Sequence, residues 1–239
     1  MRAFLFHVAI VSIASQLACT AAADDAKRVT WQPTSSGSCE NCNLFGRQMP
    51  FWDLSNAHYD NANISHASFH GAKANAAVFN GSRARRADFS RAMLNNAQFI
   101  GAKLQSANFS FAEANGANFS GATMDAGEYT DAKLVGANLT NAEAKNVRAD
   151  DADFSGANAT DATFEAANLA RASFDGALLT NTNFASANLQ DTSFRDARLI
   201  GTNLDGVVNY ESANFEGACR SKTTTLPAGL SLPLCPASN

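Results

Sequence analysis

Few side chains in this sequence have the type and spacing that redox chemistry or metal binding requires. Cys39 and Cys42 form a Cys-x-x-Cys pair, a spacing shared by thiol oxidoreductases and zinc sites. Redox use would need a thioredoxin-like βαβ context, which the surrounding sequence lacks. His66 and His70 are close enough in the chain to share a metal ion, but exposed histidines without a metal are the ordinary case. We therefore predict no redox centre and no metal.

An acidic cluster at Asp150, Asp151 and Asp153 raises the question of calcium binding. Calcium loops need regularly spaced oxygen ligands and a defining turn, and an acidic cluster is usually a solvated face. The sequence has no Ser-His-Asp arrangement, no glycine-rich phosphate loop and no paired-carboxylate signature. We predict no catalytic residue and no cofactor.

The densest basic cluster is formed by Arg83, Arg85, Arg86 and Arg91. From residue 44 to residue 120 the chain has seven basic and four acidic residues, a net charge of +3. The next stretch, to residue 215, has six basic and fourteen acidic residues, a net charge of -8. Such polarity can steer a partner or favour head-to-tail contact between copies. The four arginines are thus a possible interaction patch, with simple variation among solvated positions as the alternative.

Residues 1–23 have the pattern of a secretory signal peptide. Arg2 supplies the positive charge, a short apolar run follows, and Ala21 and Ala23 stand at positions -3 and -1 of a small-residue cleavage site. The apolar run is too short to span about 30 Å of hydrocarbon comfortably. A lipoprotein signal at Cys19 is the alternative. We predict a periplasmic or secreted protein with no transmembrane span after cleavage.

A five-residue repeat fills most of the 239-residue chain. Of the 33 positions at every fifth residue from Cys42 to Thr202, 24 are alanine. The position two residues later is mostly Leu or Phe and is never charged, and glycine recurs two residues after that. A period of five fits neither a helix nor a sustained strand. We infer a coil that turns a corner in every unit, with the glycines in the turns.

Units such as Ala107-Asn108-Phe109-Ser110-Phe111 resemble the Ala-(Asp/Asn)-Leu-X-X motif of the pentapeptide-repeat proteins. The resemblance covers about residues 42–217. It implies an all-β fold, a right-handed quadrilateral β-helix with four pentapeptides in each coil. With about 8–9 coils at strand spacing, the rod would be roughly 40 Å long.

The spacing of phenylalanine supports a four-sided coil. Phenylalanine stands at 69, 79, 89, 99, 109 and 119, and a tyrosine follows at 129. In a coil of 20 residues these rings occupy two opposite sides and stack on one another, whereas a coil of 15 would place them on leucines. Stacked large and small layers fill a narrow core without voids.

The aromatic pattern shifts in the middle of the chain. Phenylalanine returns at 154, 164, 174, 184 and 194, so the stacks move round by one side. Small residues occupy the changeover, including Ala144 and Ala149. We expect a thin or kinked waist near residues 140–150, or a coil that merely narrows there.

The two ends depart from the repeat. After Leu204 the pattern runs one residue late, in Val208-Asn209-Tyr210 and again in Ala213-Asn214-Phe215, which predicts a single-residue bulge. Solenoids need caps over their terminal coils. Residues 24–41 are expected to form an N-terminal loop or cap, and residues 218–239 a C-terminal cap or tail.

Four cysteines remain after signal cleavage, and an even number in an exported chain indicates disulfides. Cys39 and Cys42 lie at one end of the expected rod, and Cys219 and Cys235 at the other. Bonded cysteines have Cα atoms within about 7 Å, so pairs between the ends are excluded. The pairs Cys39–Cys42 and Cys219–Cys235 remain.

These observations predict a non-catalytic exported scaffold or protein-interaction module, because a filled core leaves no cleft for an enzyme. Its partner would be another protein or an envelope component, and a homo-oligomer is possible. An acidic chain is not expected to bind nucleic acid. The resemblance also implies an alternative, since some members of the family mimic DNA and bind type II topoisomerases. The acidic second half suits that role, whereas the export signal and the basic first half do not.

Overall fold

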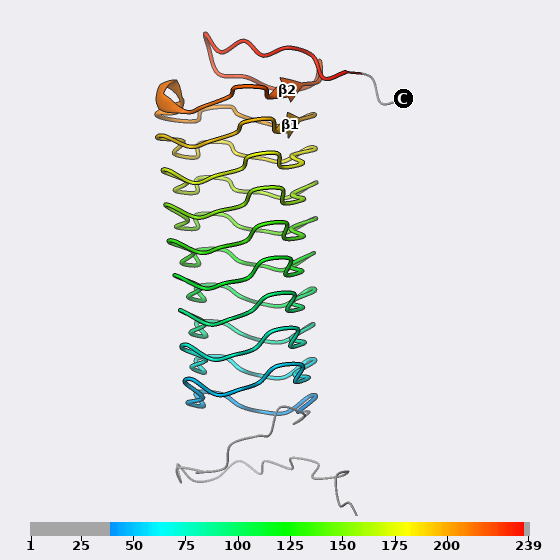
Figure 1. Ribbon diagram of the computed structural model, residues 1–239, viewed down its shortest axis with the longest axis vertical. Helices are drawn as coiled ribbons and strands as arrows, with labels where there is room; N and C mark the ends of the chain where they lie inside the picture. Colours follow the sequence, from blue (N-terminus) through cyan, green and yellow to red (C-terminus); the bar gives the residue numbers. More distant parts are fainter. Residues whose placement is uncertain (1–38, 237–239) are drawn as a thin grey trace, which may run out of the picture.

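The structure, a computed structural model, describes residues 39–236, which form a straight rod of stacked coils (Figure 1). Single parallel bridges join each residue to the one 20 positions later, as in Asn43 with Asn63 and Asn63 with Arg83. Each coil therefore contains four five-residue units, and its backbone N–H and C=O groups bond to the coils before and after it. This is the right-handed quadrilateral β-helix that the resemblance to the pentapeptide-repeat proteins implies.

The unit around Ala107 shows why the sequence turns a corner every five residues. Ala107 and Phe109 point inward and are buried, whereas Asn108 between them bridges to the neighbouring coils. The Ala107 amide donates to the Leu104 carbonyl over 2.9 Å, closing a turn whose third residue, Ser106, has a φ of 57°. Positive φ at that position favours Gly, Asn and Asp, which explains the glycine recurrence.

Each coil has four sides, which we number by their inward residues. Side 1 begins at Leu44, side 2 at Met49, side 3 at Leu54 and side 4 at Tyr59, and each continues at every twentieth residue. Rings on one side stack coil upon coil, and rings on opposite sides meet edge to face. On side 2, for example, Phe69 and Phe89 have centroids 4.7 Å apart and planes only 7° from parallel. The predicted stacking on two opposite sides is confirmed.

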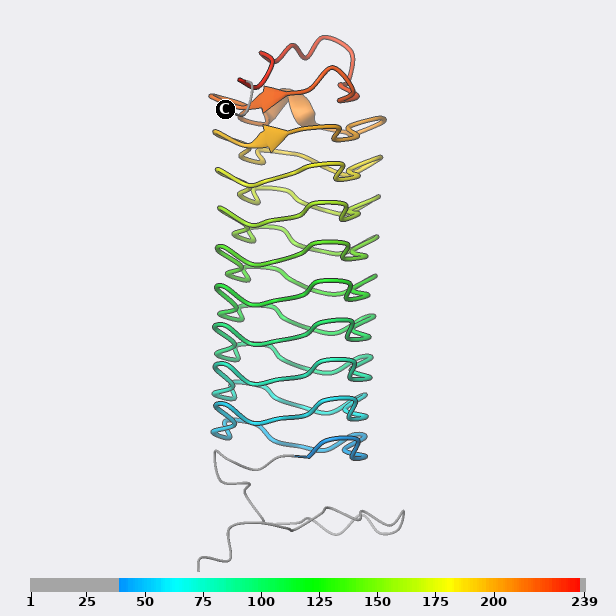
Figure 2. The ribbon, with the colours of Figure 1, turned by 90° about the vertical axis from the view of Figure 1, so that its right-hand side faces the viewer.

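The changeover near the middle of the rod also follows the prediction. Tyr129 ends the stack on side 2, and a new stack begins at Phe154 on side 3. The backbone passes through without a break, because Glu143 bridges to Thr123 below and Thr163 above. The kinked waist is therefore wrong: small buried side chains at the changeover leave the ladder intact, and the rod runs straight (Figure 2).

The register shift near the C-terminal end lies later than the sequence pattern suggests. Val208 still bridges to Asn188 at the regular offset, and Val207 takes the inward position. The extra residue is absorbed by the short 3-10 helix η1 (Tyr210–Ser212), and Asn214 pairs 21 residues back. Placing Val208 one residue late was wrong, because the adjacent valines fit either register.

The last coil is covered by the C-terminal tail (Figure 1). Strand β1 (Arg198–Leu199) pairs in parallel with strand β2 (Cys219–Arg220), and the ladder continues as Thr225 bridges to Asn203. Disulfides join Cys39 to Cys42 and Cys219 to Cys235, the expected pairs. Among residues 39–236, no helix combines the length and apolar character needed to cross a bilayer. The expected signal peptide at residues 1–23 and most of the N-terminal loop at 24–41 lie outside the described residues.

Candidate interaction surface

The outward surface of side 2 is bounded by two turns in every coil. We call the turn before it, at residues 45–46, the leading turn, and the turn after it, at residues 50–51, the trailing turn; both recur every 20 residues. The side 2 surface is defined as these two turns with the outward residues between them, such as Ser68 and Asn108. It runs along the whole rod.

The structure divides the arginine cluster between the edges of this surface. Arg85 and Arg86 occupy a leading turn and Arg91 the trailing turn of the same coil, while Arg83 points outward on side 1. The Arg85 Nε donates to the Gln105 Oε1 over 3.1 Å. The guanidinium of Arg91 lies over a phenylalanine ring of the next coil, 4.8 Å from its centroid.

None of these four arginines forms an ion pair with a residue between 39 and 236. Four of the six basic residues between positions 121 and 215 are paired differently, with an acid one coil away. Lys133 lies 3.3 Å from Glu113, and Arg171 reaches Asp151 over 2.6 Å. The positive charge on the first half of the side 2 surface is thus not neutralised by ion pairs within the rod and is available to a binding partner.

Exposed phenylalanines lie in other coils of the same leading-turn and trailing-turn columns as the arginines. Phe45 is 59% exposed, Phe51 71% and Phe111 48%. The ring of Phe51 lies over Gly71 of the next coil, where a Cβ atom would stand 2.5 Å from it. Sequence analysis missed these phenylalanines because they fall outside the inward phase. The position of these phenylalanines in turns could nevertheless be inferred from the five-residue period.

Several of these turn residues have a left-handed backbone that bulky side chains seldom adopt. The φ angles are 61° for Phe51 and Phe111, 55° for Arg86 and 59° for Arg91. Left-handed geometry costs an L-residue about 1–2 kcal/mol relative to glycine. After position 121 the same turn positions hold Gly, Asn, Asp, Ser or Ala, with Arg171 as the exception. The left-handed angle itself recurs in turns along the whole rod, at Ala126 and Ser186 for example, so the first half is distinguished by the bulk of the side chains that its turns carry.

The second half of the side 2 surface is acidic. Asp125 lies in a leading turn and Asp131 in a trailing turn, followed one coil later by Asp150 and Asp151. Hydrogen bonds from Arg171 lower the pKa of Asp151 below its ordinary value. No ion pair within residues 39–236 involves Asp125 or Asp131.

The aspartates considered for calcium already have protein partners. Asp150 lies 3.9 Å from Arg148, and Asp151 accepts two hydrogen bonds from Arg171. Asp153 accepts from the backbone and hydroxyl of Ser155. They do not belong to a metal-ligand group in the described part of the chain.

A different group, which the sequence analysis missed, could hold a metal ion. Ligand atoms of Glu40, His58 and Asp60 all lie within 4.8 Å of one another, because a 20-residue coil places position 40 beside position 60. The group is largely exposed. The histidine pair that the sequence analysis considered and did not assign as a metal site behaves differently, since His66 packs on Phe45 and His70 on Phe51.

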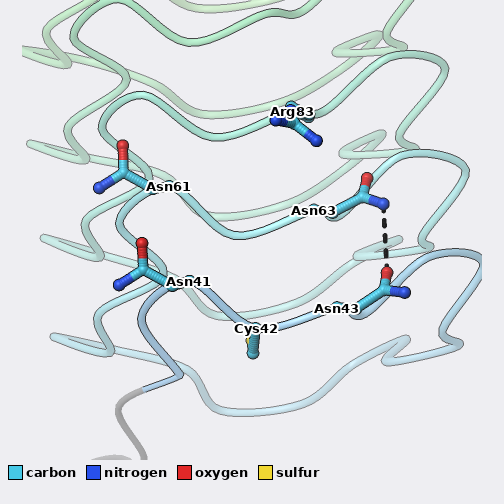
Figure 3. Close-up of a pocket in the computed structure, with 6 residues that line it drawn as sticks. All are labelled: Asn41, Cys42, Asn43, Asn61, Asn63 and Arg83. Atoms are coloured by element: carbon cyan, nitrogen blue, oxygen red, sulfur yellow. Dashed lines mark hydrogen bonds between the residues drawn. The ribbon is translucent and has the colours of Figure 1, made fainter. Parts of the chain in front are cut away.

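A shallow hollow on side 1 lies near the N-terminal end (Figure 3). Columns of asparagine line its two walls, and Arg83 lies beyond one of them. The Nδ2 of Asn63 donates to the Oδ1 of Asn43 over 3.1 Å. The hollow is open to solvent and extends the polar surface beside the leading turns.

Comparison with known proteins places the fold in a class of repeat solenoids. The family "Pentapeptide repeat region" matches residues 122–204, and "Pentapeptide repeats (8 copies)" matches residues 75–110 and 85–121. Together they cover more than half of the chain. The protein belongs to the pentapeptide-repeat family.

Solved structures of the same family are similar in architecture. HetL, a pentapeptide-repeat protein involved in heterocyst differentiation regulation in the cyanobacterium Nostoc sp. strain PCC 7120, has 25% identity and a TM-score of 0.53, over 79% of this chain and 84% of its own. The plasmid-mediated fluoroquinolone resistance protein QnrB1 has 15% identity and a TM-score of 0.46, over 78% and 94%. No curated protein matches the chain.

Proposed function

We propose that this protein is a non-catalytic, exported scaffold that binds another protein or an envelope component through the side 2 surface. The observation that carries the proposal is the combination of unpaired arginines and exposed phenylalanines on the edges of one flat surface. Arginine and aromatic residues are enriched where proteins bind one another. The stacked rings that fill the axis support a binding role rather than catalysis, since enzymes work in clefts.

Capture of partners from the native extracytoplasmic fraction tests this proposal. The variant Arg85→Glu/Arg91→Glu should lose partners that the native chain retains after crosslinking. Arg198→Glu is the matched control, because Arg198 is an exposed arginine on side 4, opposite the side 2 surface. Equal capture by all three proteins would refute a role for the surface.

Export is tested separately by fractionation and N-terminal sequencing. The proposal expects the chain outside the cytoplasm, beginning at Asp24. The DNA-mimic alternative expects inhibition of type II topoisomerase by the purified protein and a cytoplasmic location. These outcomes distinguish the two functions.

A further inference from the structure

The side 2 surface has a charge pattern that complements itself. Taking Phe111 as the centre of the trailing-turn column, Arg91 lies 20 residues before it and Asp131 lies 20 residues after it. In the leading-turn column, Arg85 and Asp125 stand at the same distances from Gln105. One coil rises about 4.8 Å, so both opposite-charge pairs are symmetric about the same level of the rod.

We propose that the side 2 surface pairs with the side 2 surface of a second copy of this chain, with the two rods antiparallel. The two-fold axis lies in the interface at the level of Phe111. Such an axis reverses the direction of the rod but keeps leading turns opposite leading turns and trailing turns opposite trailing turns. The inference rests on the proposed function. It identifies the partner that binds the side 2 surface as a second copy of this chain.

The symmetry gives Arg85 and Arg91 an acidic neighbour on the second copy. Arg91 meets Asp131 of the second copy, Arg85 meets Asp125, and the two-fold operation makes each contact twice. Phe111 meets its own counterpart on the axis, which covers two half-exposed rings. The strained left-handed backbone of Arg91 and Phe111 would thereby present both side chains to the partner.

The neighbouring levels of the surface agree with the same axis. Two coils from the centre, His70 faces Asp150 of the second copy, and three coils away the exposed ring of Phe51 faces Arg171. Each combination is attractive, the second through a cation–π contact.

The like-charged pair on this surface is Asp88 opposite Glu128, and both side chains already have partners. Asp88 accepts two hydrogen bonds from Ser90, and Glu128 lies 3.7 Å from Arg148. Their charges are therefore partly compensated within each rod. The contact area is limited to a narrow strip, so the dimer belongs with weak, charge-driven complexes that dissociate in salt.

The test measures the mass of the full chain in solution by sedimentation, with single and combined charge reversals. Arg91→Glu places two acids opposite one another, and Asp131→Arg places two bases opposite one another. Each single variant should raise the dimer dissociation constant at least about tenfold. The double variant should restore the native value, and an equimolar mixture of the two single variants should form a heterodimer. Arg198→Glu should leave association unchanged, and circular dichroism verifies that every variant folds.

A second measurement locates the axis. Phe111→Cys should form a disulfide-linked dimer on mild oxidation, because only residues near a two-fold axis bring their own counterparts within about 7 Å. Val135→Cys, an exposed apolar turn residue on another edge, should not. A chain that stays monomeric at low salt, or a mixture that fails to associate, would overturn the antiparallel dimer. Capture of a different protein by the same arginines would then leave the proposed function standing, whereas failure of both experiments would remove both proposals.

Discussion

Two phenylalanines of one repeat unit allow a direct test of the fold, because they are two residues apart and have opposite environments. Phe109 is 1% exposed and Phe111 is 48% exposed. Phe109 stacks on Phe89 at 4.9 Å and on Tyr129 at 5.1 Å, and it meets the rings at 99 and 119 edge to face. Replacing Phe109 with alanine leaves a cavity on the axis of the rod.

A buried phenylalanine truncated to alanine typically costs about 3–5 kcal/mol. Four lost ring contacts, each of about 0.5–1.5 kcal/mol beyond burial, place Phe109→Ala at the upper end of that range. Phe111→Ala loses one exposed cation–π contact and should cost less than about 1 kcal/mol. Urea unfolding followed by circular dichroism at low protein concentration measures both values. Equal losses in the free energy of unfolding would refute the inward phase, and with it the four-sided coil.

Three further predictions concern the changeover between the aromatic stacks, alkaline pH and the C-terminal cap. Gly127→Ala should lower the free energy of unfolding by about 1–3 kcal/mol, measured in urea, because its Cβ would stand 2.8 Å from the Tyr129 ring. Burial raises the pKa of Tyr59 to about 12 and raises that of Tyr129 still further. Stability is therefore complete below pH 10, the unfolded value, and falls as pH rises above it; Tyr129→Phe should flatten that decline in a pH series of thermal melts. Reducing Cys219–Cys235, which closes a 16-residue separation, should destabilise the C-terminal cap by roughly 3 kcal/mol and expose it to protease, and unchanged proteolysis would contradict this.

The coil architecture was predictable because its signal is distributed over the whole chain. The ten-residue spacing of phenylalanine supports the four-sided coil that the family resemblance implies and identifies the sides that carry rings, and the contacts between Phe69, Phe79 and Phe89 follow it. The disulfide pairs followed from rod length alone. Features that depend on one or two residues were harder to predict from the sequence. The register near the C-terminal end is an example, since Val207 and Val208 are equally apolar candidates for the inward position.

The side 2 surface was only half predictable. Arg86 and Arg91 share the phase of the glycines, so their placement in two successive turns could be read from the period of five. The position of the Phe51 ring could not, because it depends on the absence of a side chain at Gly71, one coil away. In this solenoid, neighbouring residues on one side of the surface are 20 positions apart in the sequence. A surface patch can therefore be identified from the sequence only when the coil length is known.

Unpaired surface charge alone would be weak evidence for binding, because an exposed ion pair is worth only about 0–1 kcal/mol. Simple variation could therefore leave Arg85 or Arg91 without an ion-pair partner at almost no cost. The backbone makes the case different: Arg86, Arg91 and Phe111 accept left-handed angles that glycine or asparagine would adopt more easily. Each such residue sacrifices more free energy than the missing ion pair would have contributed. The same angle recurs on the second half, at Ala126 and Asp131, so the distinguishing feature of the first half is the large side chains that its turns carry. Together with the opposite charge of the second half, these side chains form the asymmetry that an interface between antiparallel rods requires.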